Sequence, residues 1–127
     1  MLPGVTKVMT KDGAEMSLDE ALTGAETVGI YFSAHWCPPC RGFTPVLAQF
    51  YEEVNKDAKV FEIIFVTSDR DDAAFKEYFG TMPWKAAPFD IDRNAIKTMH
   101  GVQGIPMLAI FKADGTKLSD NARGEVH

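Results

Sequence analysis

The chain of 127 residues has little cysteine, with only Cys37 and Cys40. Two cysteines cannot make the disulfide framework of a small secreted domain, and alone they cannot supply a four-thiolate zinc site. A chain of this length buries about two-thirds of the surface that its unfolded form exposes, so it can hold a hydrophobic core without cross-links. We therefore expect one folded domain over residues 1–127.

Basic blocks and long apolar runs are also missing. The formal net charge is −5, from 18 acidic and 13 basic side chains, which predicts no binding to nucleic acid or to an anionic membrane. The longest apolar stretches, residues 28–34 and 63–66, are far shorter than the roughly 20 residues of a transmembrane helix. The first residues lack the apolar core of a signal peptide. We expect a cytoplasmic monomer, with nuclear residence and unconventional secretion left open.

Apolar patterning predicts an α/β unit in which strands and helices alternate. Val28–Ser33 and Phe61–Thr67 are apolar on both faces, as in buried central strands. Near the start we expect a hairpin of residues 5–9 and 14–16 around Lys11-Asp12-Gly13, followed by a capped helix from Ser17 to Gly24. Further helices are expected at 71–79 and 92–100. The last two strands are expected at 105–112 and 116–119, joined by a turn at Asp114-Gly115. Residues 82–89 are expected to form a loop. This order indicates a mixed central sheet with helices on both faces.

A longer helix is expected from Cys40 to about Asn55. Its apolar residues recur at helical spacing: Phe43, Val46, Leu47, Phe50, Tyr51 and Val54. Pro45 lies inside this segment, where it removes a backbone donor and should kink the helix axis.

The two cysteines form a Cys37-Pro38-Pro39-Cys40 motif at the start of that helix. Free backbone N–H groups and the positive end of the helix dipole favour a thiolate at Cys37. A thiolate attacks disulfides, and Cys40, one helical turn further on, can attack the resulting mixed disulfide. The prolines fix the turn and lack N–H donors, so the thiolate depends on the N–H and thiol of Cys40. A motif of this kind beside a buried strand predicts a redox site that works through its own disulfide, without metal or other cofactor.

Three simpler interpretations compete with a redox site. A purely structural disulfide closing a four-residue loop would contribute only about 1.9 kcal/mol. A zinc site would need two further ligands, and the only histidines are His35, His100 and His127. Accidental packing of two buried cysteines is disfavoured because we expect the motif to be exposed at a helix start.

The segment Gly104-Ile105-Pro106 is the second element of the predicted site. An X-Pro bond is cis in only about 5–6% of cases, but beside this cysteine motif we expect the cis form. That geometry would turn the Ile105 backbone toward the disulfide, where its N–H and C=O can pair with an extended substrate strand. The small Gly104 would leave room for the substrate to approach.

Several segments together resemble one family. YFSAHWCPPCRGFTP, FEIIFVTSDR, FKEYFGTMPW and GVQGIP follow in an order similar to that of the thioredoxin superfamily, and within it of the tryparedoxin and nucleoredoxin branch. The similarity extends over residues 5–125. It implies a thioredoxin fold, Cys37 as nucleophile, Cys40 as resolving cysteine, Trp36 as a ring that shields the pair and Pro106 as the cis-proline. Pro45 matches the helix kink of the family.

Some positions depart from the family pattern. Thioredoxins in the narrow sense carry a buried aspartate six residues before the nucleophile, as proton acceptor for the resolving thiol, where this chain has Tyr31. Proton transfer at Cys40 must then use water or another group.

Ser68 replaces the usual tryptophan of tryparedoxins, which weakens a trypanothione-specific interpretation. Arg123 aligns with a family arginine proposed to attract the acidic end of a substrate, with a solvated strand-end charge as the alternative. Trp84 is expected in the core, with the rim of the site as the alternative.

The end of the chain also departs from the fold that the resemblance implies. Thioredoxin folds close with a helix over one face of the sheet, but after the last expected strand only residues 120–127 remain, interrupted by Gly124. We expect this C-terminal helix to be short or missing, with exposed apolar surface near the last strands.

Two functions are compatible with this sequence. The first is a dithiol-disulfide oxidoreductase that reduces disulfide-containing proteins, a peroxidase among its candidate partners. It would serve redox homeostasis and be recharged by an upstream thiol or flavoenzyme reductase. The second, which the nucleoredoxin resemblance allows, is a redox-sensitive binding module whose cysteines change its affinity for a partner.

Overall fold

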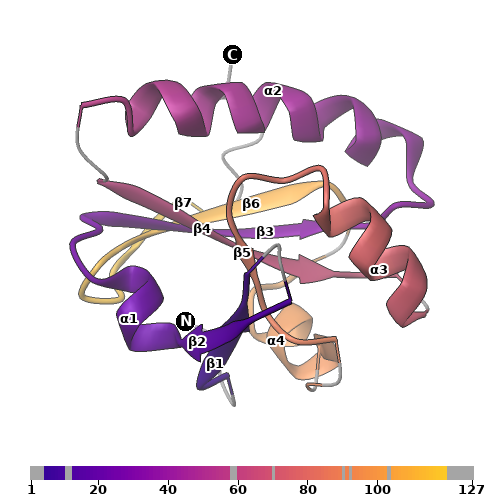
Figure 1. Ribbon diagram of the computed structural model, residues 1–127. Coiled ribbons are helices and arrows are strands. Elements are labelled where there is room, and N and C mark those ends of the chain that lie inside the picture. Colours follow the sequence, from indigo (N-terminus) through magenta and orange to yellow (C-terminus); the bar gives the residue numbers. More distant parts are fainter. Residues whose placement is uncertain are drawn as a thin grey trace.

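The computed structural model describes residues 5–10, 13–57, 60–69, 71–89, 91, 93–102 and 104–119. Among them, seven strands form one mixed sheet in the order β2-β1-β5-β4-β3-β6-β7 (Figure 1). At its centre, β3 (Thr27–Ser33) is parallel to β4 (Phe61–Thr67) and antiparallel to β6 (Met107–Lys112). The outer strands are β1 (Lys7–Met9), β2 (Glu15–Ser17), β5 (Lys85–Ala86) and β7 (Lys117–Ser119).

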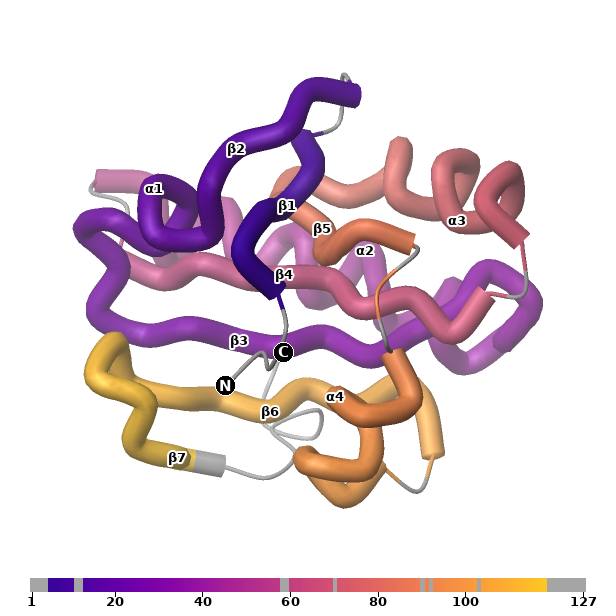
Figure 2. The backbone as a smooth tube through the Cα atoms, turned by 90° about the horizontal axis from the view of Figure 1, so that it is seen from below, coloured from indigo at the N-terminus to yellow at the C-terminus, as the bar shows by residue number. Residues whose placement is uncertain are grey.

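Helices pack on both faces of the sheet, as the sequence predicts (Figures 1 and 2). α2 (Pro38–Val54) and α3 (Asp72–Phe79) share an apolar cluster with one face. α1 (Leu18–Leu22) and α4 (Arg93–Met99) lie against the other face. Successive side chains of a strand point to opposite faces, so β3 sends Tyr31 to the first cluster and Ile30 to the second.

The two central strands are buried over nearly their whole length. All seven residues of β4 are buried, and in β3 only Thr27 is partly exposed. Gly29 lets the neighbouring side chains approach β3 closely: a Cβ at this position would lie 3.1 Å from both Leu108 Cδ1 and Phe61 Cζ. These strands confirm the predicted buried pair, with β3 beginning one residue earlier than expected.

Helix α2 begins two residues before the predicted start at Cys40. Pro38 occupies its first position, where a missing N–H costs nothing because no intrahelical partner exists there. The helix buries Cys40, Thr44, Leu47 and Tyr51, whereas Val46 and Val54 are exposed at 40% and 37%. The expected apolar stripe is therefore rotated toward Thr44, and Pro45 lies inside the helix as predicted.

The shorter elements largely follow their local signals. Ser17 caps α1 by accepting the Glu20 N–H at 3.1 Å, and Asp71 caps α3 by accepting the Ala74 N–H at 2.7 Å. The helix expected at 92–100 is α4, followed by Gly101 at φ 65°. β1 and β2 pair as the predicted hairpin, although Lys11 and Asp12 of its turn lie outside the described residues.

The prediction that residues 82–89 form a loop is wrong at one place. Lys85 and Ala86 form β5, which pairs in parallel with β4 and in antiparallel with β1. Two paired residues leave no alternating pattern in a sequence, so only the neighbouring strands reveal this element.

The predicted C-terminal helix region, residues 120–127, lies outside the described residues. On the last strand, Leu118 is 52% exposed, in line with the expected apolar surface near the sheet edge.

Candidate active site at the N-terminus of helix α2

The cysteine motif lies where β3 passes into α2, at the carboxyl end of the parallel strands. Cys37 is the N-cap residue of α2, and its carbonyl accepts the Arg41 N–H at 3.1 Å. Both cysteines are free thiols. The helix start therefore places Cys37 at the positive end of the α2 dipole, as the motif predicts.

The expectation that the motif is exposed is wrong for the two thiols. Cys37 is 5% exposed and Cys40 is fully buried. They pack with Ala34 and with the partly buried Ile105. Pro38 and Pro39 are the exposed residues of the turn. The cause is the tight turn, which leaves the prolines exposed and packs both cysteine side chains in a small cluster with Ala34.

Burial sets the protonation of the second cysteine. Burial and a hydrogen bond with Cys37 raise the pKa of Cys40 to about 11. Hydrogen bonds from the Ser33 hydroxyl and the Ala34 N–H act in the opposite direction. Near neutral pH Cys40 is thus a thiol that must lose a proton before it can act as a nucleophile.

The loop before β6 closes the site on the side of Cys37. The Ile105–Pro106 peptide bond is cis, as predicted. The Cys37 sulfur lies 3.9 Å from the Ile105 carbonyl oxygen, so the backbone of this loop does reach the thiol. Gly104 is exposed, and a Cβ there would meet no atom within 4 Å. The space for a substrate at Gly104 is open, and the roles of Gly104 and Ile105 in binding stay predictions.

Trp36 lies at the rim of the site. The residue is 54% exposed, and its Nε1–H donates to the Ser68 carbonyl at 3.2 Å. The shielding role that the resemblance implies stays a prediction. Trp84 is 1% exposed and packs edge-on against Tyr31 and Tyr51, which confirms its place in the core.

A buried carboxylate, which the sequence analysis missed as a functional group, anchors the segment before Cys37. Asp69 is 1% exposed; its Oδ1 accepts the His35 N–H and its Oδ2 accepts the Thr67 hydroxyl, each at 2.8 Å. Arg93 of α4 donates to the carbonyls of Thr67 and Asp69. The sequence signal was an acidic residue two positions after a buried strand, but its partner His35 lies 34 residues away along the chain.

Tyr31 stands where the family aspartate would be, and it belongs to a cluster of hydroxyl groups. Its hydroxyl lies 2.7 Å from Thr44 Oγ1, which donates to the Cys40 carbonyl at 3.0 Å. The Tyr78 hydroxyl contacts both Thr44 Oγ1, at 2.5 Å, and Ser33 Oγ, at 2.7 Å. Burial raises the pKa of Tyr31 well above the usual range and also raises the pKa of Tyr78. The sequence analysis missed Ser33, Thr44 and Tyr78, which surround Cys40 with neutral, protonated hydroxyls.

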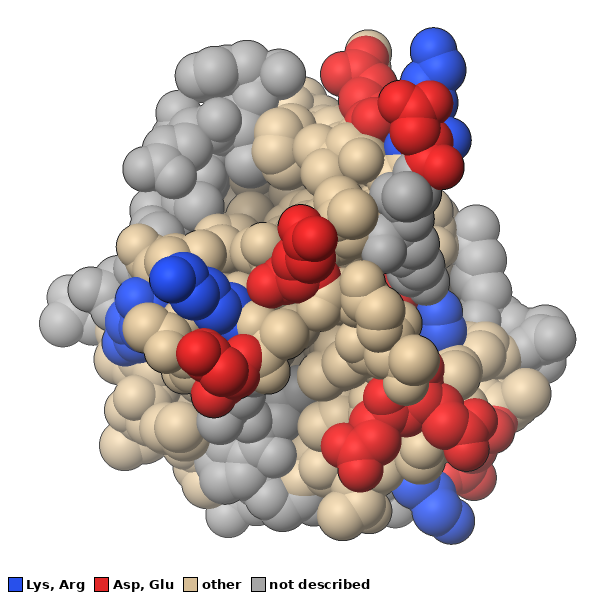
Figure 3. All heavy atoms as spheres, turned by 90° about the vertical axis from the view of Figure 1, so that its left-hand side faces the viewer, with Lys and Arg blue, Asp and Glu red and all other residues tan. Residues whose placement is uncertain are grey.

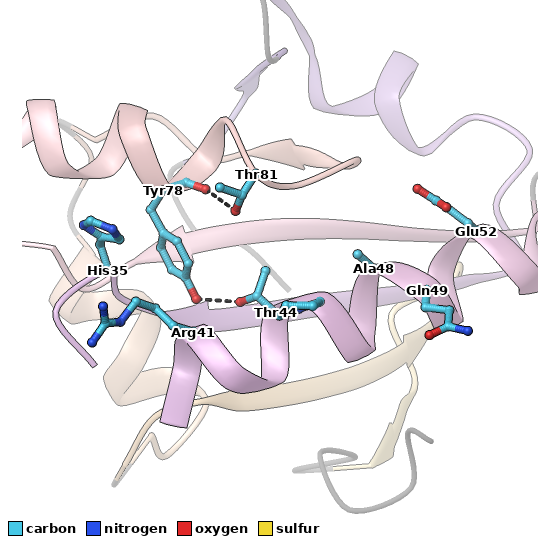
Figure 4. A pocket seen from close by; sticks show the side chains of 9 residues that line it. His35, Arg41, Thr44, Ala48, Gln49, Glu52, Tyr78 and Thr81 are labelled. Atoms are coloured by element: carbon cyan, nitrogen blue, oxygen red, sulfur yellow. Dashed lines mark hydrogen bonds between the residues drawn. The ribbon is translucent and has the colours of Figure 1, made fainter. Parts of the chain in front are cut away.

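A groove between α2 and α3 opens beside this cluster (Figure 4). It has a volume of about 530 Å³, and Thr44 and Tyr78 lie among its lining residues together with His35 and Arg41. In Figure 4 the Tyr78 side chain reaches from α3 toward Thr44 on α2. The His35 and Tyr78 rings are 5.6 Å apart between centroids, so one end of the groove adjoins the segment that leads to Cys37.

The remaining candidate residues can be placed briefly. Arg123 lies outside the described residues, and its substrate role stays a prediction. Within the described part of the chain, no three His, Cys, Asp or Glu side chains are grouped to hold a metal ion. His100 is buried between the rings of Phe32 and Phe111.

A comparison of the sequence with protein families agrees with the fold and the site described above. A family model described as "Thioredoxin-like" matches residues 24–116. The chain belongs to this family. The matched range contains both cysteines, the cis-proline loop, Asp69 and the hydroxyl cluster.

Two curated relatives place the chain within that family. It is 46% identical over 129 residues to tryparedoxin from Trypanosoma brucei brucei, which covers 98% of the chain and 86% of the relative. It is 42% identical over 112 residues to nucleoredoxin from Mus musculus, covering 87% of the chain but only 26% of that longer protein. This thioredoxin-family redox protein is therefore similar to both branches that its motifs resemble.

Solved structures give the same result for the fold. The thioredoxin from Wuchereria bancrofti has a TM-score of 0.89 and 39% identity, covering 98% of this chain and 88% of that one. A tryparedoxin II complexed with glutathionylspermidine has a TM-score of 0.86 and 37% identity, with coverages of 96% and 85%. The thioredoxin fold expected from the sequence is confirmed.

Proposed function

We propose that this protein is a thiol-disulfide oxidoreductase that reduces disulfide bonds of other proteins. The observation that carries the proposal is Cys37 at the N-terminus of α2, beside the buried thiol of Cys40 and 3.9 Å from the Ile105 carbonyl. Homologous tryparedoxins and thioredoxins support the class of reaction.

The proposed reaction has two thiol-disulfide exchange steps. The Cys37 thiolate attacks one sulfur of the partner disulfide, which forms a mixed disulfide and releases the other sulfur as a thiolate. The Cys40 thiolate then attacks Cys37 Sγ, forms the Cys37–Cys40 disulfide and releases the second partner sulfur. The partner gains two electrons and two protons, and an upstream reductant must return two electrons to the site.

The shape of the site favours an extended peptide as substrate. The Ile105 backbone borders the Cys37 sulfur, Gly104 leaves open space, and Pro38 and Pro39 beside Cys37 are exposed. An extended peptide can pair with a backbone segment of this kind.

The partners follow from the chemistry and from the relatives. We propose a low-molecular-weight thiol or a flavoenzyme as electron donor, since the related tryparedoxin II binds glutathionylspermidine, and a peroxidase as one protein substrate. Acidic side chains predominate over basic ones among the described residues on the face in Figure 3, which disfavours polyanionic partners.

None of the described helices has the length and apolar character to cross a membrane. We place the protein in the cytoplasm, where thiols stay reduced.

Insulin reduction tests the proposed function directly. The wild-type protein with dithiothreitol should accelerate the turbidity of reduced insulin, and Cys37→Ser should abolish that acceleration because the attacking thiolate is gone. If Cys37→Ser keeps full activity, the proposal is wrong. Side-by-side reduction of the oxidised protein by trypanothione, glutathione and a flavoenzyme reductase identifies the donor.

The similarity to nucleoredoxin favours a second candidate, a redox-sensitive binding module. In this case the state of Cys37 and Cys40 would change the affinity for one partner without turnover. A Cys40→Ser variant separates the two functions, because it arrests exchange at the mixed disulfide. Many captured partners support the oxidoreductase, whereas one partner whose affinity follows oxidation supports the module.

A further inference from the structure

The groove between α2 and α3 carries opposite charges at its two ends. Arg41 and His35 lie at one end, and Glu52 lies at the other (Figure 4). The thiol-disulfide exchange proposed above uses none of the α2 side chains that line it. Six of them share one face of the helix, at the spacing of successive turns: Arg41, Thr44, Pro45, Ala48, Gln49 and Glu52.

Both charged ends are available to a ligand. Arg41 and Glu52 are exposed, and neither side chain makes an ion pair or a hydrogen bond with another of the described residues. A ligand of complementary charge can therefore form an ion pair at each end without breaking one between described residues. Because the two ends differ in sign, they also fix the direction in which such a ligand lies.

Between its ends the groove is uncharged. Pro45 and Ala48 offer apolar surface, and Gln49 offers an amide with both donors and acceptors. The Thr81 hydroxyl donates to the Tyr78 carbonyl at 2.7 Å, so its oxygen can still accept a hydrogen bond. Polar groups among apolar surface suit a polypeptide backbone, because each peptide unit carries one donor and one acceptor.

The length of the groove fits a short extended peptide. Arg41 and Glu52 are eleven positions apart on α2, which is about 16 Å along the helix axis. In an extended chain, side chains four positions apart point to the same side and are separated by about 13 Å. Long charged side chains can bridge the remaining difference. The groove volume of about 530 Å³ lies within the range of about 300–1,000 Å³ that is usual for ligand clefts.

We propose that this groove binds an extended peptide segment of a partner protein. An acidic side chain of the segment pairs with Arg41, and a basic side chain four positions along the segment pairs with Glu52. That the partner is a disulfide-containing protein rests on the proposed function, whereas the binding of the peptide does not.

The place of the groove connects this binding with the cysteine motif. His35 lines the Arg41 end and is two residues before Cys37. A partner held in the groove is therefore anchored beside the segment that leads to the thiol. Such a second contact raises the effective concentration of the partner at the site, so the charge pattern of a partner contributes to its selection.

The first experiment measures peptide binding by NMR with the ¹⁵N-labelled oxidised protein, in which no free thiol takes part. The probe is acetyl-Glu-Thr-Val-Thr-Lys-amide. It should shift the amide signals of residues 41–52 and 78–81 in a saturable manner. The neutral peptide acetyl-Gln-Thr-Val-Thr-Gln-amide should bind about tenfold more weakly, because it can form neither ion pair.

The second experiment reverses the charge at each end of the groove. Glu52→Lys should weaken binding of the probe about tenfold, because repulsion of its lysine replaces attraction, and Arg41→Glu should do the same at its glutamate. Glu52→Lys should also bind acetyl-Glu-Thr-Val-Thr-Glu-amide more tightly than the wild type does. The matched control is Glu53→Lys, the same charge change at an exposed neighbour that does not line the groove. It should leave the affinity for the probe nearly unchanged.

Several outcomes would overturn the proposal. It is wrong if the probe causes no saturable shifts, if the shifts gather at the Ile105 loop, or if the neutral peptide binds equally well. Equal weakening by Glu52→Lys and Glu53→Lys would show an effect of net charge alone. If the groove signals change with protein concentration in the absence of peptide, a second copy of the chain occupies the groove instead.

The insulin assay separates this proposal from the proposed function. If the wild-type protein reduces insulin but does not bind the probe, the oxidoreductase stands and the peptide groove is wrong. If it binds the probe with the expected charge dependence but does not reduce insulin, the groove stands and the proposed function is wrong.

Discussion

At the scale of single residues, the site depends on groups that hold its loops in place. Asp69 is nearly fully buried, and both of its carboxylate oxygens accept hydrogen bonds. One of these bonds fixes the backbone of His35, two residues before Cys37. A carboxylate suits this place because it offers acceptors on both sides and no donor.

Asp69→Asn should therefore destabilise the protein. The amide can keep one of the two acceptor contacts, but its NH₂ group then faces a donor. We expect a loss of about 1–3 kcal/mol in the free energy of unfolding, measured by urea denaturation. Asp72→Asn removes a carboxylate from an exposed pair with Lys76 and should change stability by less than about 0.5 kcal/mol. Equal losses in the two variants would contradict the anchoring role.

Sequence alone predicted the cysteine motif and the cis-proline loop of the candidate site better than their surroundings. Cys37, Cys40 and the cis bond before Pro106 follow from local motifs, and the structure brings these residues together. Ser33 and Tyr78 are 45 positions apart, and a serine or tyrosine at a strand end or on a helix has many ordinary uses. Their contact exists only because α3 packs over the end of β3, which no local pattern encodes.

At the scale of secondary structure, buried strands were the easiest elements to predict. β3 and β4 are apolar on both faces, and their close packing depends on Gly29, whose missing side chain makes room for Leu108 and Phe61. β5 was missed because two residues carry no periodic signal. α2 begins earlier than its apolar pattern because its first turn is made of prolines.

Two glycine substitutions should have opposite effects. Gly29→Ala places a Cβ 3.1 Å from two apolar side chains and should cost about 1–3 kcal/mol through overpacking. Gly42→Ala lies inside α2 with nothing within 4 Å and should stabilise the protein by about 0.5–1 kcal/mol, because alanine favours the helix. The midpoints of urea denaturation of both variants, compared with the wild type, measure these changes in stability. A stabilising Gly29→Ala would show that the sheet has room at this position.

At the scale of the whole molecule, the alternation of strands and helices predicted the mixed sheet and its two covered faces. The hydrophobic pattern cannot reveal the order of the strands at the edge, where β5 joins β1 to β4. Stability is also a property of the whole molecule, and here it is linked to pH through the buried thiol.

The reduced protein should lose stability as the pH rises from about 9 to about 11. The pKa of Cys40 is raised from 9.0 to about 11 in the folded state, so folding favours the thiol over the thiolate. Its contribution is complete below the unfolded pKa and disappears as the pH passes the folded pKa, a loss of roughly 3 kcal/mol. Urea denaturation of the reduced wild type and of Cys40→Ala across this range measures the difference. The raised tyrosine pKa values act on both proteins alike, so a parallel pH dependence of the two would contradict the assignment to Cys40.

The complete burial of Cys40 also determines how the site responds to oxidative damage. Peroxide can reach a sulfur only if that sulfur is accessible, and Cys40 has no exposed surface while Cys37 keeps a little. The first oxidation product is then a sulfenic acid on Cys37, and the neighbouring Cys40 thiol condenses with it to a disulfide and water. In the proposed function the same disulfide is the oxidised form of the site, so a reductant that recharges the protein would also repair this damage.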